Sequence, residues 1–285
     1  MDPRALKQFV VLAESLHFGR ASETSHVSPS ALSRGIQRLE NELGVTLFER
    51  NNRSVALTRA GNLFLDYARD SLGQWDAIRS VLMEEAGELH GEISMYCSVT
   101  ASYSFLFDLL TRFRHDHPHV EIKLHTGDPE DAIPRVLAGN EDIAIGAKPD
   151  RLQAGLAFRL IEFSPLVFIA SKNHPAPNMA DWSENPMILS ERGLARRRMD
   201  EWFRSLGVQP RIYAQVAGNE AIVSMVSLGF GVGVVPRIVL DNSPLSHRIR
   251  VLDVKPPLED YEVGLFALER RLANPLIHAF WSQLK

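Results

Sequence analysis

The sequence has a single cysteine and no long apolar run, and both shortages narrow what the chain can be. With only Cys97 in 285 residues no internal disulfide can form, which fits a reducing compartment. Asp2, Arg4 and Glu14 interrupt the apolar residues near the start, so no secretory signal is recognised. No stretch approaches the roughly 18 apolar residues of a membrane helix. We therefore expect a cytoplasmic protein that does not enter a membrane.

Catalytic and metal-binding patterns are also missing. The sequence contains no nucleophile elbow, phosphate loop or zinc-protease motif. His115, His117 and His119 lack cysteines or carboxylates at a matching spacing, so no metal site is predicted. The glycines of 229–233 follow a helical pattern and enter a strand, the reverse of a dinucleotide-binding loop. We expect neither an enzyme nor a bound cofactor.

The overall charge is weakly informative. A net charge of −4 gives no sign of a nucleic-acid partner, but one basic face on a small domain is sufficient for DNA binding. The length allows two or three domains, and the 45% hydrophobic content is that of an ordinary globular protein. Local patterns therefore have to identify the partners.

Three short helices are predicted before Gly44. The first begins at Asp2-Pro3, and the second covers residues 20–25 after a turn at Gly19. Ser28 is the predicted N-cap of the third helix, with Pro29 at its first position. One face of this third helix is apolar and consists of Leu32, Ile36, Leu39 and Leu43. The other face carries Ser30, Ser33, Arg34, Gln37 and Arg38.

The polar face of the third helix suits DNA. Any amphipathic helix has a polar outer face, so this pattern alone is weak evidence. However, Arg pairs with guanine and Gln with adenine in a major groove, and the preceding short helix and turn complete a helix-turn-helix. Residues 47–58 then predict two short strands around a polar turn, a wing whose Arg50 and Arg53 could contact phosphates. We predict an all-α winged helix-turn-helix domain.

A long linker helix is predicted next. From Thr58, a predicted N-cap, to about Ala86 there is no proline, and apolar residues spread over more than one helical face. Such a helix has to pack against another subunit or domain. A buried helix within one globular domain is the alternative. Two-fold pairing would place two recognition helices roughly 34 Å apart, matching successive major grooves.

The remaining two-thirds of the chain predict an α/β fold, because strands and helices alternate. Strands are expected over 93–99, 120–124, 143–145, 212–216 and 232–235, and helices over 103–113 and 220–228. Crossings near 161–165 and 262–268 would join two lobes around a cleft. Ligands of parallel sheets bind beyond the carboxyl ends of the strands, near helix N-termini.

Polar residues gather where these predicted strands end. Hydroxyls and backbone N–H groups at the start of a helix favour an anion such as a carboxylate, to which a lysine or an arginine could add positive charge. Hydroxyls that only cap a helix, and arginines that only face solvent, are the alternatives. The predicted small-molecule contacts are Ser98, Thr100, Ala101, Ser102, Thr126, Lys148, Arg196 and Asn219.

Several runs together resemble the LysR-type transcriptional regulators in order and spacing. They are His17-Phe18-Gly19-Arg20-Ala21, Val27-Ser28-Pro29-Ser30-Ala31-Leu32-Ser33-Arg34, Ile36-Gln37-Arg38-Leu39-Glu40, Leu47-Phe48 and Leu57-Thr58-Arg59-Ala60-Gly61. The resemblance implies a dimer or tetramer that binds double-stranded promoter DNA and contacts RNA polymerase. It also implies a C-terminal two-lobed effector domain like the periplasmic binding proteins. The candidate DNA contacts are Arg20, Ser28, Pro29, Ser30, Ser33, Arg34, Gln37, Arg38, Arg50 and Arg53.

Gly35 departs from the family, which usually carries a long polar residue at this position. Glycine inside a helix costs roughly 1 kcal/mol relative to alanine, so a softer recognition helix is expected.

Within the family, the match is narrower still. The runs Cys97-Ser98-Val99-Thr100-Ala101, Thr126-Gly127-Asp128 and Arg196-Arg197-Arg198 resemble activators of the acetohydroxy acid isomeroreductase gene of isoleucine–valine biosynthesis. This resemblance implies a 2-aceto-2-hydroxy acid effector, acetolactate or acetohydroxybutyrate. A regulator of another pathway with a different small carboxylate, a two-lobed enzyme and a solute-binding protein are the alternatives.

The expected domain limits follow from these elements. Residues 1–58 form the DNA-binding domain, 59–90 the linker helix and hinge, and 91–285 the effector domain. Lobe I is expected to cover 91–161 and 266–285, and lobe II 162–265.

Overall fold

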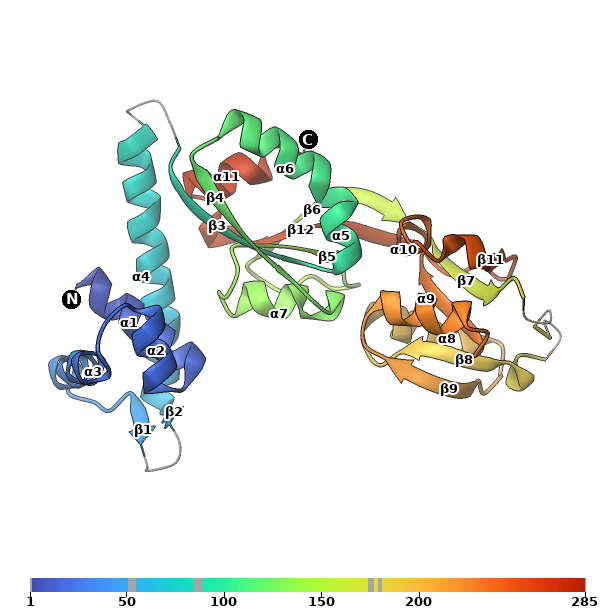
Figure 1. The fold of residues 1–285 in the computed structure, drawn as a ribbon, viewed down its shortest axis with the longest axis horizontal. Coiled ribbons are helices and arrows are strands. Elements are labelled where there is room, and N and C mark those ends of the chain that lie inside the picture. The colour runs from blue at the N-terminus through green and yellow to red at the C-terminus, as the bar shows by residue number, and fades with distance from the viewer. Residues whose placement is uncertain (1, 51–54, 85–88, 174–176, 179–180, 285) are drawn as a thin grey trace. The chain divides into compact units, whose positions relative to one another are not determined.

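The computed structural model describes residues 2–50, 55–84, 89–173, 177–178 and 181–284. Contacts divide the chain into two units, Met1–Gly91 with Ala273–Leu276 and Glu92–Leu272 with Ile277–Lys285. The first unit is mostly helical, whereas the second is built on two sheets (Figure 1).

Three helices open the first unit: α1 Pro3–Ser15, α2 Phe18–Thr24 and α3 Pro29–Leu43. Ser28 caps α3 as predicted, because its Oγ accepts a hydrogen bond from Ala31 N at 3.2 Å. The second helix begins before the predicted residue 20, since His17 Nδ1 accepts from Arg20 N and serves as the cap. Gly19 therefore lies inside α2.

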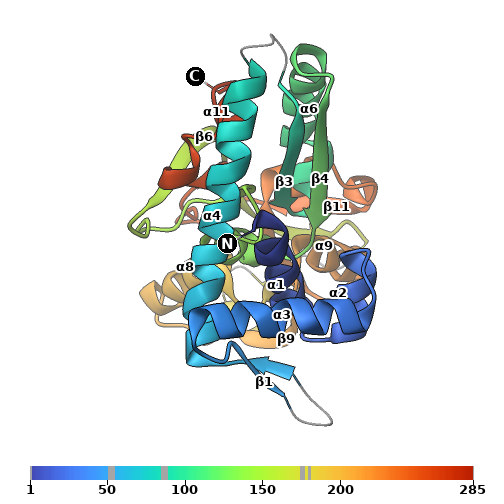
Figure 2. The same cartoon turned by 90° about the vertical axis from the view of Figure 1, so that its left-hand side faces the viewer.

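A hairpin and a long helix complete the first unit. Strands β1 Phe48–Arg50 and β2 Val55–Leu57 pair antiparallel and form the predicted wing. Thr58 Oγ1 then accepts from Gly61 N at 2.9 Å and caps α4 Arg59–Glu84, the predicted linker helix. Figure 2 shows α3 along its length, with the hairpin beside it.

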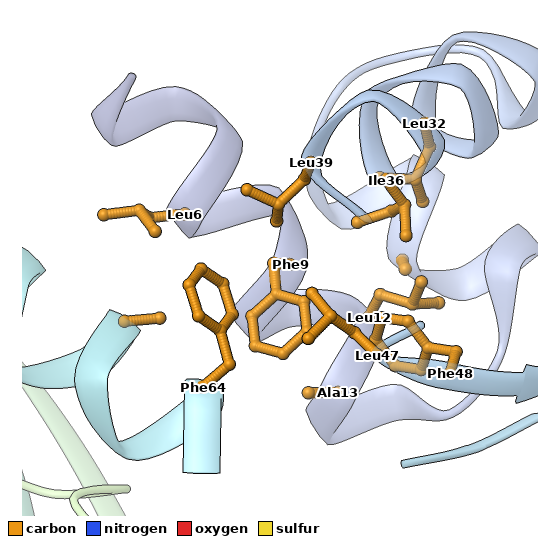
Figure 3. Packing of buried hydrophobic residues seen from close by; sticks show 12 residues of the cluster. Leu6, Phe9, Leu12, Ala13, Leu32, Ile36, Leu39, Leu47, Phe48 and Phe64 are labelled. Atoms are coloured by element: carbon orange, nitrogen blue, oxygen red, sulfur yellow. The ribbon is translucent and has the colours of Figure 1, made fainter. Parts of the chain in front are cut away.

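Apolar side chains from α1, α3, β1 and α4 form one core in this unit (Figure 3). Phe9 packs against Phe48 and Phe64, with ring centroids 5.3 and 4.9 Å apart. Leu32 and Ile36, from the apolar face predicted for α3, are fully buried here. Their burial fixes which side of α3 faces outward.

The first lobe of the second unit, lobe I, is a five-stranded sheet in the order β4-β3-β5-β12-β6. The strands are β3 Gly91–Cys97, β4 Val120–Thr126, β5 Ile143–Ala147, β6 Leu156–Ser164 and β12 Tyr261–Leu268. The helices are α5 Val99–Tyr103, α6 Phe105–Asp116, α7 Ala132–Leu137 and α11 Pro275–Trp281, with 3-10 turns at Pro129–Asp131 and Glu269–Arg271. Helices α6 and α11 cover one face and α7 the other (Figure 1).

The second lobe, lobe II, repeats this plan with the strand order β11-β7-β10-β8-β9. Its strands are β7 Leu166–Ser171, β8 Pro186–Ser190, β9 Arg211–Val216, β10 Val232–Pro236 and β11 Ile249–Leu252. Its helices are α8 Gly193–Ser205, α9 Asn219–Ser227 and α10 Arg237–Asp241, with 3-10 turns at Trp182–Glu184 and Ser246–Arg248. Parallel pairs β8–β9 and β8–β10 confirm the predicted α/β architecture.

The chain crosses between the lobes twice: the first crossing follows Ser164, within the predicted 161–165, and the second precedes Tyr261, earlier than the predicted 262–268. Strand β6 continues to Ser164 and pairs there with Tyr261, the first residue of β12. Residues 162–164 and 261–265 thus belong to the sheet of lobe I, although the sequence placed them in lobe II. Pro165 follows Ser164 directly and marks the end of the strand.

In the part of the chain that the structure describes, no helix is both long and apolar enough to span a membrane. The same residues contain no group of His, Cys, Asp and Glu side chains arranged to hold a metal ion.

Gly35→Ala is expected to stabilise the first unit by up to about 1 kcal/mol, because alanine restricts the unfolded chain and favours helix. A Cβ here would lie 3.1 Å from Gln8 Oε1, the flexible end of a side chain that can move. Gly61→Ala is the contrasting variant, since its Cβ would lie 2.1 Å from the Leu47 carbonyl oxygen. Native-state hydrogen exchange of α1–α3 amides in the full chain measures both effects. Equal effects of the two substitutions would contradict this reading of the packing.

Candidate functional sites: a basic helix face and an inter-lobe cleft

The outward face of α3 carries the polar residues predicted to meet DNA. Ser30, Arg34, Gln37 and Arg38 are exposed, and Ser33 is half-buried. Among the described residues, no hydrogen bond or ion pair engages the side chains of Arg34, Gln37 or Arg38. Long donors without an internal partner are available to an external acceptor such as a base edge or a phosphate.

The hydroxyls at the start of α3 cap the helix and are also exposed to an external partner. Ser28 and Pro29 are exposed, and Ser28 Oγ lies 3.1 Å from Ser30 Oγ while it caps the helix. The backbone N–H groups of a helix start favour an anion, and here two hydroxyls stand next to them.

Two of the predicted DNA contacts are held by the protein itself. Arg20 is exposed, but its Nη2 donates to the Ser15 carbonyl at 3.0 Å. Arg50 Nη2 donates to Glu40 Oε2 at 2.6 Å, and its guanidinium lies 5.3 Å from the Phe18 ring centroid. Glu40 also accepts from the backbone N–H groups of the wing, so Arg50 joins the wing to α3. Arg53 lies outside the described residues.

A cavity of about 170 Å³ lies between the two lobes of the effector domain. The ends of β3 and β5 contribute from lobe I, and the starts of α8 and α9 contribute from lobe II. Its polar lining residues are Ser98, Thr100, Asp128, Glu130, Ser190, Glu191, Arg192, Arg197, Asn219 and Tyr261. The cavity is smaller than the roughly 300–1,000 Å³ of pockets for drug-sized ligands, which suits a small metabolite.

Half of the small-molecule contacts predicted from the sequence line this cavity. Ser98, Thr100, Ala101 and Asn219 do so, from the strand exits that the sequence pointed to. Ser98 also has the capping role considered as the alternative, since its Oγ accepts from Ala101 N at 3.2 Å.

The other predicted contacts lie outside the cavity lining. Ser102 donates to the Val99 carbonyl at 2.6 Å, one helical turn into α5. Thr126 is an exposed residue of β4, because that strand runs two residues further than predicted, and the polar lining begins at Asp128.

Lys148 and Arg196 are engaged elsewhere. Lys148 Nζ donates to Glu262 Oε2 at 2.7 Å and lies 5.1 Å from the Phe158 ring centroid. Arg196 Nε donates to Asp200 Oδ1 at 2.9 Å. Both side chains are satisfied by neighbours on adjoining strands or turns of helix.

Arg192 lines the cavity although the sequence did not point to it, and Arg197 lines it in place of Arg196, the member of the arginine run named from the sequence. In the run Arg196-Arg197-Arg198, the first arginine pairs with Asp200 and the last with Glu259. Arg197 is the exposed member that lines the cavity. The periodicity of α8 could have separated these three arginines, because neighbouring residues on a helix point in different directions.

The cleft also contains acidic groups with shifted pKa values. Burial raises the pKa of Glu130, and the nearby Asp128 charge raises it further, whereas the Leu194 N–H and Arg197 oppose the shift. Burial likewise raises the pKa of Tyr261, and the nearby Glu130 charge raises it further. Tyr261 is therefore a neutral hydroxyl in this cavity at any physiological pH.

Cys97, which ends β3, is fully buried, and burial raises the pKa of its thiol to about 12. A thiol that stays protonated is a poor nucleophile, so Cys97 packs in the core of lobe I.

Thr100 is tied directly to the other lobe. Its backbone N–H and its Oγ1 both donate to Glu220 Oε1 of α9, at 3.0 and 2.6 Å. Arg192 of lobe II pairs with Asp128 and Asp131 of lobe I, at 3.0 and 2.8 Å. The cavity is thus bounded by polar contacts that join the two lobes.

A winged helix-turn-helix in one chain with a two-lobed, polar-lined cleft defines a transcription regulator that senses a small molecule. Residues 3–62 match the family described as "Bacterial regulatory helix-turn-helix protein, lysR family", and residues 86–285 match the "LysR substrate binding domain". The chain belongs to the LysR family of transcriptional regulators, as the sequence runs predicted.

Two relatives of high identity agree with this assignment, and a solved structure agrees in fold. The chain is 46% identical to the "HTH-type transcriptional activator IlvY" of Salmonella typhimurium over 100% of this chain and 99% of that protein. It is 45% identical to the "HTH-type transcriptional regulator IlvY" of Escherichia coli with the same coverage. Full-length OxyR from Pseudomonas aeruginosa has a TM-score of 0.72 at 24% identity, covering 99% of this chain and 94% of that one. These relatives are named as regulators, and the chain is a regulator rather than an enzyme.

Proposed function

We propose that this regulator activates the acetohydroxy acid isomeroreductase gene of isoleucine–valine biosynthesis in response to acetolactate or acetohydroxybutyrate. The observation that carries the proposal is the similarity to activators named IlvY over the whole chain, effector domain included. A likeness confined to the DNA-binding domain would say nothing about the effector.

The proposed DNA interface is the outward face of α3. Arg34, Gln37 and Arg38 reach base edges, while Ser28, Pro29, Ser30 and Ser33 lie against the phosphates at the start of the helix. Arg20 and Arg50 support this surface through Ser15 and Glu40 and add positive charge to its edge. Arg53, which lies outside the described residues, is proposed to contact phosphate.

The proposed effector site is the inter-lobe cavity. Arg197 is an exposed cationic group in its lining, and Ser98 and Asn219 offer hydrogen bonds from opposite lobes. A 2-aceto-2-hydroxy acid presents a carboxylate, a hydroxyl and a ketone within a few bonds. The carboxylate has two oxygens, so it can accept from Arg197 and from the Thr100 donors, while the hydroxyl and the ketone bond to the neutral polar groups.

A dimer through α4 is proposed because this helix presents an apolar stripe to solvent. Leu63, Tyr67, Trp75, Ile78 and Leu82 lie within one side of the helix, and Leu63 and Leu82 are 66% and 64% exposed. A second copy of α4 would cover the stripe and bring two copies of α3 to one DNA face.

A tetramer is proposed from two further apolar patches on the effector domain. Tyr103 and Phe107 are exposed on α5 and α6 of lobe I, and Tyr213 and Phe230 are exposed on lobe II with ring centroids 6.0 Å apart. Pairing through α4 alone covers neither patch.

The proposal assigns one task to each segment. Residues 1–58 bind DNA, 59–90 pair the subunits, and 91–285 bind the effector. Activation in the cytoplasm then includes a contact with RNA polymerase.

Arg34→Ala and Gln37→Ala should each weaken binding to the chain's own upstream promoter DNA by about 1–3 kcal/mol and relax base preference. Arg114→Ala, an exposed arginine on α6, is the control and should leave affinity unchanged. Fluorescence anisotropy at several salt concentrations measures both. Binding by the wild type that does not weaken with salt would contradict a DNA interface.

Arg197→Ala should weaken acetolactate binding by about 1.5–3 kcal/mol, because a charge-assisted hydrogen bond to the carboxylate is lost. Arg211→Ala, an exposed arginine on β9, should bind as the wild type does. Calorimetry measures the affinities, and transcription with purified RNA polymerase reads out activation. Tight binding of an unrelated carboxylate, with none of acetolactate, would point to another pathway.

Leu63→Glu with Leu82→Glu should raise the dimer dissociation constant at least roughly 30-fold, since the two most exposed apolar contacts of the stripe become charged. Leu152→Glu, at an exposed loop position of the effector domain, is the matched control. Sedimentation velocity over a concentration series measures the change. An unaltered dimer in the double variant would exclude pairing through α4.

A further inference from the structure

Two hydrogen-bond donors of Thr100, a residue of the cavity lining, are occupied by one of the chain's own carboxylates. Thr100 is only 2% exposed, and Glu220 Oε1 accepts from both its N–H and its Oγ1. The two residues belong to different lobes, α5 of lobe I and the first turn of α9 in lobe II. Ser98, Thr100 and Asn219, which adjoin this contact, line the cavity.

A second carboxylate, from lobe I, lies at the start of a helix in lobe II. Glu130 of lobe I lies against the first turn of α8, in lobe II, next to Gly193. A Cβ at Gly193 would lie 1.8 Å from the Glu130 carboxyl carbon, so only glycine leaves room for this carboxylate. Each lobe thus places a glutamate on a helix start of the other.

These contacts are placed where an anionic ligand would bind. A carboxylate that approached the Thr100 donors would meet the Glu220 charge at hydrogen-bonding distance, and two like charges cannot share one donor set without a large electrostatic cost. The contact of Glu220 with Thr100 and the binding of a carboxylate at Thr100 therefore exclude each other.

We propose that the Glu220 carboxylate occupies part of the effector site when no ligand is bound. An anionic effector displaces this carboxylate from Thr100, and the displacement breaks a contact between the two lobes. The inference rests on the proposed function, because it takes the inter-lobe cavity as the site of a small carboxylate. It assigns Glu220 two effects: it lowers effector affinity, and it holds the ligand-free lobes together. Displacement couples ligand binding to lobe movement, since the ligand removes a contact that only the ligand-free form makes.

The lobe contact is tested without any ligand by measuring the distance between spin labels at Arg114→Cys on α6 and Arg204→Cys on α8, both exposed positions. The native Cys97 is buried, with its thiol pKa raised to about 12, so it stays unlabelled. Labelled chains are diluted with unlabelled chains to suppress distances between subunits. Glu220→Ala should lengthen or broaden the distance distribution, whereas Glu201→Ala, an exposed glutamate on α8, should not. A distribution unchanged by Glu220→Ala would overturn the proposal.

The competition is tested by calorimetry with acetolactate on the wild type, Glu220→Gln and Glu201→Gln. Glutamine keeps the shape but removes the charge, so Glu220→Gln should bind at least about five-fold more tightly than the other two. Equal or weaker binding by Glu220→Gln would overturn the proposal and make Glu220 a ligand contact or a structural residue. If none of the three forms binds acetolactate, the proposed effector fails, and the label distances alone decide on Glu220.

Discussion

The pairing of β6 with β12 is the constraint on which the geometry of the effector domain depends. The two strands pair from Leu156 opposite Leu268 to Ser164 opposite Tyr261, where both reach the edge of lobe I. The two crossings between the lobes therefore lie side by side, at Ser164 and Tyr261. Because no other covalent link joins the lobes, side-chain contacts across the cleft set how far they open. The Arg192–Asp128 ion pair and the Thr100–Glu220 hydrogen bond are two such contacts across the cleft.

The DNA-binding domain could be predicted almost completely from the sequence because its signals are local. Ser28 and Thr58 cap helices within three residues of themselves, and the apolar face of α3 repeats at helical spacing. What escaped prediction was the engagement of Arg50, because its partner Glu40 comes from the preceding helix and serves the wing backbone at the same time. The sequence around a basic residue does not show which carboxylate it pairs with.

The cleft was predicted only in part because its residues meet through tertiary contacts. The strand exits at Ser98 and Asn219 were recognisable from the alternation of elements alone. By contrast, Arg192 pairs with an aspartate 64 positions away, and Thr100 with a glutamate 120 positions away. Lys148 and Arg196 have the charge that a carboxylate ligand needs, but they pair with Glu262 and Asp200 instead. Charge and position along the chain do not fix the direction in which a side chain points.

The attachment of α4 to the wing and to α1 has a mechanical consequence. Thr58 Oγ1 donates to the Thr46 carbonyl, Gly61 lets the helix backbone lie against Leu47, and Arg69 pairs with Glu14 at 2.9 Å. Helix α4 and the winged helix-turn-helix domain therefore move as one rigid arm. In the proposed dimer, a change in the angle between two such arms would move the two DNA-binding domains apart or together, and so select between operators of different spacing or curvature.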